Sequence, residues 1–240
     1  QRQMCIRDSP ALQEHLDGIL AGGNLIFCTA EGFVHNDPAI QQAWENDYNA
    51  AGDGPQGICL VTGAMGPIEN IHPSIKNVAG AQSSGAALVS FNAPAFCSYG
   101  KEQNLNAPSG KYASFAYTSA LNHLLADRDH VFRIGDATVV CWSRNAKPAY
   151  AALFGGVALG SAVPSYTEND LRGMVKSLCA GQSVIYQEDR LDPDMDFYVL
   201  GLSPNAARLS VRFFLHNTFK GFLDNIQAPI SYTHLTLPTT

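Results

Sequence analysis

The sequence predicts an α+β protein with mostly antiparallel strands, several helices and long polar loops. Short apolar runs of strand length alternate with segments that have the 3.6-residue period of amphipathic helices. One pair of these runs is separated by a two-residue turn, which is typical of an antiparallel hairpin. Of the 240 residues, 46% are apolar and 15% are charged, a composition that supports a core and excludes the disordered class.

The first half of the chain contains two expected helices and three expected strands. Residues 11–21 have helical spacing, and a second helix is expected from Pro38 to about residue 51. Asn36 or Asp37 can cap this second helix, because proline favours the first helical position and a short polar side chain favours the cap. The expected strands are residues 25–28, 58–62 and 87–92.

The second half of the chain has clearer periodic patterns. Residues 112–125 carry apolar side chains at helical spacing, and we expect Phe115, Leu121 and Leu124 to pack inward. Residues 131–142 predict a hairpin around a central Gly-Asp turn. The remaining expected elements are a helix at 168–179 and two strands, 197–202 and 209–215, joined by residues 203–205.

Two long stretches, residues 63–85 and 92–110, lack a regular pattern and keep many polar side chains. Compact domains rarely hold such long loops unless the loops serve a function. We therefore expect the functional residues to lie in or beside these two stretches.

Charge, cysteine usage and hydropathy restrict the classes of function. The net charge of −6 argues against a protein that coats nucleic acid alone, although a large assembly can distribute phosphate contacts over several subunits. The six cysteines are widely spaced and form no C-x-x-C pair, which argues against a zinc knuckle or a redox pair and favours a reducing, cytoplasmic compartment. No apolar run approaches the roughly 18 residues of a membrane span, so no membrane contact is expected.

Two short motifs resemble catalytic or metal sites. Residues 81–85 read AQSSG, a variant of the G-x-S-x-G nucleophile elbow with alanine at the first position. An elbow needs a helix after its turn, whereas a strand is expected here, so a serine hydrolase using Ser83 is kept as an alternative. Asp192, Asp194 and Asp196 alternate as in a calcium loop, but the glycine and glutamate of that loop are missing, which predicts a solvated turn. No P-loop and no G-x-G-x-x-G fingerprint occurs, and no cofactor is expected.

Apart from these motifs, the polar side chains of the chain suit the binding of nucleic acid. In such binding, amides and hydroxyls read base edges, lysines neutralise phosphates and aromatic rings stack on unpaired bases. Side chains suited to these roles cluster in the two long loops and at the start of the following helix. The candidates are Lys76, Gln82, Ser83, Ser84, Asn92, Tyr99, Lys101, Gln103, Asn104 and Lys111. Asn106 and Tyr112 belong to the same cluster.

A longer part of this region resembles a known family. Residues 80–103 read GAQSSGAALVSFNAPAFCSYGKEQ, and the similarity continues to Trp142. Further matching strings are VHNDPAI at 34–40, LVTG at 60–63, HPSIK at 72–76 and FYVLGLSPNAARLSVRF at 197–213. Over nearly all of residues 20–225 the chain resembles the Csd family, the large subunit of the type I-C CRISPR surveillance complex, Cascade.

The resemblance implies a non-catalytic role in antiviral defence. Members of this family sit beside the subunit that holds the 5′ handle of the guide CRISPR RNA. They recognise the protospacer-adjacent motif (PAM) on target double-stranded DNA, help to open its strands and help to recruit a separate helicase-nuclease. The implied partners are therefore the other Cascade subunits, the guide RNA, the target DNA and the helicase-nuclease.

Under this resemblance, we expect the loops at residues 76–85 and 99–106 to face the duplex beside the PAM. Gln82, Ser83 and Ser84 suit the minor groove, where acceptors need donors and there is little room. One alternative is that these three side chains cap the following strand through hydrogen bonds to its backbone. Another is a purely structural assembly subunit, whose polar loops contact protein.

The two ends of the chain differ in character from the rest. Residues 1–9 and 231–240 resemble translated sequencing-adapter sequence, and we expect both segments to be non-native and to pack poorly. Full-length members of the family have a further N-terminal region and a C-terminal helical part. The expected organisation is thus an internal part of the large subunit, residues 10–230, between two non-native segments.

Overall fold

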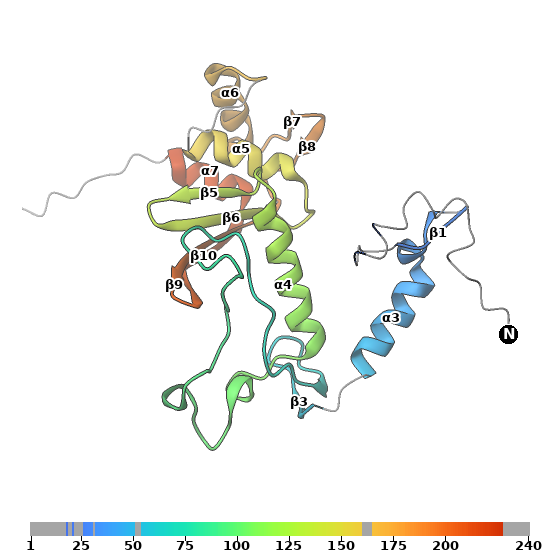
Figure 1. The fold of residues 1–240 in the computed structure, drawn as a ribbon. Helices are drawn as coiled ribbons and strands as arrows, with labels where there is room; N and C mark the ends of the chain where they lie inside the picture. The colour runs from blue at the N-terminus through green and yellow to red at the C-terminus, as the bar shows by residue number, and fades with distance from the viewer. Residues whose placement is uncertain are drawn as a thin grey trace, which may run out of the picture. The chain divides into compact units, whose positions relative to one another are not determined.

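The computed structural model describes residues 18, 21, 26–30, 32–50, 54–159 and 165–227. The chain divides into two compact units, Gln1–Pro55 and Gln56–Thr240 (Figure 1). The two end segments and most of the expected helix at 11–21 lie outside the described residues. None of the described helices is long and apolar enough to cross a membrane.

The described part of the first unit is a small hairpin followed by one helix. Strand β1 (Cys28–Thr29) pairs antiparallel with β2 (Gly32–Phe33), and a 3-10 turn, η2 (Val34–Asn36), leads into α3 (Pro38–Ala50). The Asp37 carboxylate accepts a hydrogen bond of 2.7 Å from the Ala39 N–H, which confirms Asp37 as the cap and Pro38 as the first helical residue. The strand expected at 25–28 is wrong at residues 26 and 27, which precede β1.

The second unit is built around a four-stranded antiparallel sheet of order β10-β9-β6-β5. Its strands are β5 (Val131–Ile134), β6 (Ala137–Ser143), β9 (Asp196–Asn205) and β10 (Arg208–Thr218). The predicted hairpin at 131–142 is confirmed, with Gly135 at φ +61° in its two-residue turn. The strands predicted at 197–202 and 209–215 are confirmed as well. Their turn, however, lies at residues 206–207, because Asn205 pairs with Arg208 and extends both strands.

One face of the sheet is covered by three helices. These are α5 (Pro148–Leu159), α6 (Glu168–Cys179) and α7 (Phe219–Gln227), which gather on the same side of the sheet (Figure 1). Two of them, α5 and α7, pack directly on the sheet, and the third, α6, packs against those two. The helix predicted at 168–179 is confirmed, and Thr167 and Asp170 cap it reciprocally in a capping box. Between α6 and β9 lies a short hairpin of β7 (Val184–Tyr186) and β8 (Asp189–Leu191).

The other face of the sheet packs against α4 (Lys111–Ala126), which confirms the helix predicted at 112–125. Leu121 is buried and Leu124 half-buried against this core, as expected. Phe115 is 38% exposed, so its predicted inward packing is wrong. The buried stripe of α4 runs through residues 114, 118, 121 and 125, and residue 115 lies beside that stripe.

The segment between the first unit and α4 is largely irregular, as predicted for residues 63–85 and 92–110. Strand β3 (Gln56–Ile58) pairs with β4 (Met65–Pro67), and two 3-10 turns follow, η3 (Pro94–Phe96) and η4 (Gln103–Asn106). The strand expected at 58–62 is wrong after Ile58, because residues 60–62 form a turn. The strand expected at 87–92 is also wrong, since within it only Ala87 bridges to another strand, at Arg208.

Candidate nucleic-acid interface

The loop at residues 76–85, which we name the Gln82 loop, leaves the core through a narrow neck. At this neck Ile75 and Ala86 exchange two backbone hydrogen bonds, each of 2.9 Å. The Ile75 side chain is fully buried, and Val78 is buried in the same cluster, against the sheet and α4. The base of the loop is therefore anchored in the hydrophobic core.

Two polar side chains of the scaffold fix the path of this loop. Asn122 on α4 accepts a hydrogen bond of 2.7 Å from the Lys76 N–H, and its amide donates one of 3.0 Å to the Ser74 carbonyl. On β6, the Thr138 hydroxyl accepts one of 3.0 Å from the Ala79 N–H. These bonds satisfy backbone groups that a β-ladder would otherwise satisfy, so the loop is ordered without being a strand.

The tip of the Gln82 loop displays three of the predicted site residues. The Gly85 N–H donates a hydrogen bond of 2.9 Å to the Gln82 carbonyl and closes a turn, with Gly85 at φ +97°. Gln82, Ser83 and Ser84 are exposed, and no side-chain hydrogen bond joins them to another described residue. The strand that they were alternatively expected to cap is not formed. Lys76 is exposed at the start of the same loop.

The second predicted loop, at residues 99–106, is named the Tyr99 loop. The Lys101 N–H donates to the Ser98 carbonyl at 3.0 Å, and Tyr99 and Gly100 have φ values of +53° and +68° in the turn between them. Tyr99 is 97% exposed, and Lys101 and Gln103 are also exposed. These three side chains are available to a ligand.

Asn106 holds the Tyr99 loop together. Its side-chain oxygen accepts a hydrogen bond of 2.9 Å from the Ser98 N–H, and its amide nitrogen donates to the carbonyls of Lys101 and Gln103, at 3.2 Å and 2.9 Å. All three bonds join Asn106 to the backbone of residues 98–103. Asn106 is therefore a structural residue of this loop.

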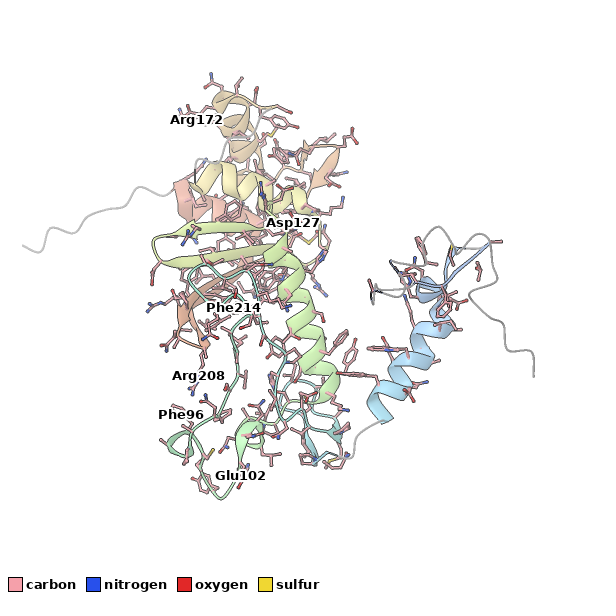
Figure 2. The ribbon with its side chains drawn as sticks, viewed as in Figure 1. Phe96, Glu102, Asp127, Arg172, Arg208 and Phe214 are labelled. Carbon is pink, nitrogen blue, oxygen red and sulfur yellow. The ribbon has the colours of Figure 1, made fainter. Side chains whose placement is uncertain are left out.

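Arg208, a residue that the sequence did not indicate, joins the two loops to the sheet. It lies at the start of β10, where Ala87 pairs with it just after the Gln82 loop. Its guanidinium donates to the Asn92 side-chain oxygen and lies 4.2 Å from the centre of the Phe96 ring. Arg208 and Phe96 are labelled in Figure 2. Asn92 is thus exposed but already engaged by Arg208. Arg208 thus contacts the chain on both sides of residues 88–91: its backbone bridges Ala87 after the Gln82 loop, and its guanidinium contacts Asn92 and Phe96 before the Tyr99 loop.

Asn104 lies in the interior, unlike the other candidates. It is 2% exposed and lines a cavity of about 140 Å³ together with Asn92, Gln103 and His72. His72 is buried, and its Nδ1 lies 2.6 Å from the Tyr117 hydroxyl oxygen, while its Nε2 has no partner. Burial lowers the pKa of His72 and raises the pKa of Tyr117 to about 12, so both groups are neutral at neutral pH.

The remaining candidate, Lys111, is half-buried at the first turn of α4, and Tyr112 beside it is exposed. The structure therefore brings together Asn92, Gln103 and Asn104 around one cavity. It places Gln82, Ser83 and Ser84 on a separate loop that shares the Arg208 anchor through Ala87.

The two catalytic and metal motifs of the sequence have ordinary structural explanations. Ser83 lies in a turn that neither follows a strand nor precedes a helix, so the elbow geometry is missing. The Asp192 carboxylate accepts a hydrogen bond of 3.0 Å from the Asp194 N–H, and Asp196 begins β9, which confirms the predicted turn. Across the described residues, no group of three His, Cys, Asp or Glu side chains could hold a metal ion.

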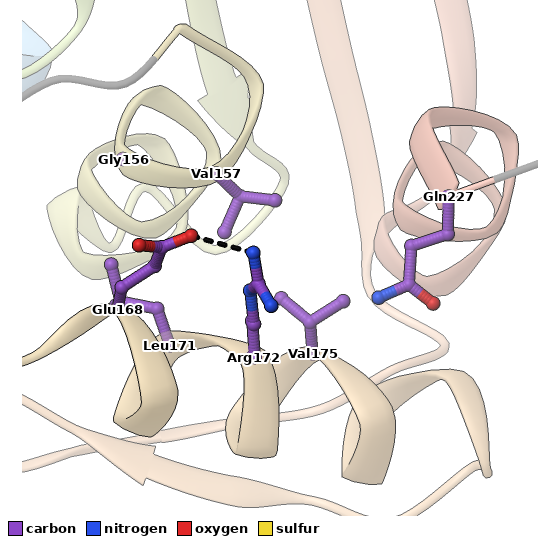
Figure 3. A pocket seen from close by; sticks show the side chains of 7 residues that line it. All are labelled: Gly156, Val157, Glu168, Leu171, Arg172, Val175 and Gln227. Carbon is purple, nitrogen blue, oxygen red and sulfur yellow. Dashed lines mark hydrogen bonds and ion pairs between the residues drawn. The ribbon is translucent and has the colours of Figure 1, made fainter.

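A larger cavity of about 530 Å³ lies among α5, α6 and α7 and contains none of the predicted residues. Figure 3 shows its lining side chains, and its dashed line marks the ion pair between Arg172 and Glu168 on α6. The two charged groups of this pair are 2.7 Å apart. Both partners of this pair are well exposed, and such surface pairs contribute roughly 0–1 kcal/mol. The cavity therefore offers little specific chemistry.

Comparison with known protein families gives a match over almost the whole chain. The family model described as CRISPR-associated protein (Cas_Csd1) matches residues 2–235. No curated protein matches the chain. Because the family model covers almost the whole sequence, the protein belongs to the Csd1 family of CRISPR-associated proteins, the family of the type I-C large subunit.

Proposed function

We propose that this protein is a non-catalytic subunit of a cytoplasmic, CRISPR RNA-guided DNA surveillance complex, in which its two polar loops face the target duplex beside the PAM. Through them it contributes to PAM recognition and target DNA binding, and the assembled complex then recruits the helicase-nuclease. The observation that carries the proposal is the Gln82 loop. Its base is fixed in the core, and its exposed tip presents an amide and two hydroxyls without partners in the described structure.

A loop of this kind suits the recognition of base edges. Because Asn122 and Thr138 hold its backbone, little conformational entropy is lost when the tip meets DNA. Short hydroxyls and a planar amide fit the narrow minor groove, whose acceptors need donors. Within the family, base pairing with the guide RNA would read the remaining sequence.

Phosphate contacts would come from exposed lysines beside the tips of the loops. Lys76 lies at the start of the Gln82 loop and Lys101 in the turn of the Tyr99 loop. The chain as a whole carries a charge of −6, so binding would depend on such local cations and on the other Cascade subunits.

We expect Gln82→Ala to weaken motif-dependent binding by about 1–3 kcal/mol, as for a lost base contact. The measurement is the affinity of the assembled complex, carrying the full-length subunit, for duplexes with and without the motif. Gln182→Ala, at an exposed glutamine after α6, is the matched control and should bind as the parent does. If Gln82→Ala kept the motif preference and lowered the melting temperature, the loop would be structural.

We expect Lys101→Ala to weaken binding to all duplexes equally, because a phosphate contact carries no sequence information. The slope of log affinity against log salt concentration should become shallower by about 0.9. The same change at Lys176, an exposed lysine on α6, should leave the slope at its parent value. An unchanged slope for Lys101→Ala would remove the Tyr99 loop from the interface.

A further inference from the structure

The cavity that joins three of the predicted residues, here named the His72 cavity, has a mouth and a floor. Asn92 and Gln103 are exposed and lie at its mouth, whereas His72 and Asn104 are buried and form its floor. Part of the wall is apolar, including the half-buried Phe91. The space thus leads from the surface of the Tyr99 loop to two polar groups in the interior.

The two groups on the floor lack partners. His72 Nε2 is inaccessible to solvent and forms no hydrogen bond, and no hydrogen bond joins the Asn104 amide to another described residue. An unsatisfied buried polar atom such as His72 Nε2 costs about 1–3 kcal/mol, so proteins rarely keep one without a reason. A ligand that hydrogen-bonds His72 Nε2 would recover that free energy, and the Asn104 amide lines the same cavity.

The size and charge of the cavity restrict what that ligand can be. The volume is about 140 Å³, and an apolar protein cavity of about 150 Å³ is known to bind benzene, a single six-membered ring. No Lys, Arg, Asp or Glu lines the space, and the Arg208 guanidinium is bonded to Asn92 at the mouth, so the floor offers no counter-charge to a phosphate or a carboxylate. The ligand group is therefore neutral, planar and ring-sized, with a polar edge.

We propose that the His72 cavity receives one unpaired nucleobase of the target DNA, at the point where the duplex opens beside the PAM. This inference rests on the proposed function, which supplies both the DNA and the strand opening. The base edge would meet His72 Nε2 and the Asn104 amide, and the ring would lie against the apolar wall.

The two polar groups on the floor can pair with either a hydrogen-bond donor or an acceptor on the base edge. The Tyr117 hydroxyl can donate to His72 Nδ1 or accept from it, so Nε2 acts as a donor in one tautomer and as an acceptor in the other. An amide likewise offers both a donor and an acceptor. A side-chain amide from a protein partner would satisfy the same groups, but it lacks a ring and would leave much of the volume empty.

The test uses Asn104→Leu in the full-length subunit within the assembled complex. Thymine is placed in turn at each position of the DNA stretch that opens beside the motif, and its oxidation by permanganate is measured. In the parent complex one thymine should be protected while its unpaired neighbours react. In the variant complex that thymine should become at least about tenfold more reactive, which corresponds to one lost base contact.

Thermal stability separates this role from a structural one. Leucine has nearly the shape of asparagine, and the substitution breaks no side-chain hydrogen bond to another described residue, so the melting temperature should stay the same or rise. Asn70→Leu makes the same chemical change at an exposed site outside the cavity and should leave the protection intact. Ser90→Leu, which narrows the cavity from its wall, should expose the thymine as Asn104→Leu does.

The outcomes also separate this inference from the proposed function. If no thymine reacts in the parent complex, the duplex is not opened and the proposed function itself fails. If all unpaired thymines react equally, or if Asn104→Leu leaves the protection intact, the cavity does not hold a base. If Asn104→Leu weakens assembly of the complex and leaves the thymines unchanged, a protein side chain occupies the cavity and the inference is overturned.

Discussion

Phe197→Ala is expected to lower the free energy of unfolding by about 3–5 kcal/mol, as for other fully buried aromatic residues. Phe197 is 0% exposed and lies at the centre of the helix-covered face of the sheet. Its ring centroid is 5.2 Å from those of Phe154 and Phe219 and 5.7 Å from that of Phe222. The substitution removes all three ring contacts, each worth about 0.5–1.5 kcal/mol beyond its buried area.

The measurement is chemical denaturation of the chain followed by circular dichroism, with the denaturant slope compared between variants. Phe214→Ala is the matched control, because Phe214 lies on the neighbouring strand and is 56% exposed. It should cost less than about 1 kcal/mol, in the range of surface substitutions. Equal losses for the two variants would mean that the sheet does not bury the face assigned here to the core.

Gly85→Ala is expected to cost about 2–4 kcal/mol of stability and to abolish motif-dependent binding. Gly85 has φ +97°, and a Cβ atom there would lie 2.8 Å from Ser74 Cβ and 2.9 Å from the Ile75 carbonyl oxygen. The second of these atoms is backbone at the neck of the Gln82 loop. The neck must therefore open, which displaces Gln82, Ser83 and Ser84 together.

The measurements are thermal unfolding of the chain and the affinity of the assembled complex for motif-bearing duplex. Gly63→Ala separates the steric cost from the backbone cost, because Gly63 has φ +71° with nothing within 4 Å of an added Cβ. It should cost about 1 kcal/mol, from backbone strain alone. If Gly85→Ala bound motif DNA as the parent does, the tip of the loop would have no part in recognition.

The parts of the fold that the sequence predicts well are those determined by local pattern. Helix α4, the β5–β6 hairpin and α6 each carry their own period, turn or cap, so their bounds agree closely with the expected ones. Helix α5 was missed because it is apolar almost all round and buried on most sides, which leaves no periodic face to detect. Helix α7 was also missed, and its nine residues give only a short pattern.

The errors in the loop region have a different cause. Residues 87–92 read as a strand because an apolar run has the same composition whether it pairs or lies half-buried against a core. Only Ala87 finds a strand neighbour, and that neighbour, Arg208, lies far along the chain. His72 looked unremarkable in sequence because its partner Tyr117 is 45 residues away, so the cavity became visible only in the folded structure.

The anchors of the Gln82 loop also determine when this part of the protein can fold. Its bonds to Asn122 and Thr138 span 46 and 59 residues, and the guanidinium link between Asn92 and Arg208 spans 116. At a synthesis rate of about 5–20 residues per second, Arg208 leaves the ribosome on the order of ten seconds after Asn92. During that interval Ala87 and Asn92, which follow the loop, lack their partner Arg208, so we expect the segment after the loop to be fixed only when the β9–β10 hairpin docks. We therefore expect the chain between the two proposed DNA-facing loops to order late, so slow docking of the hairpin would delay the assembly of a functional complex even where the rest of the core had already formed.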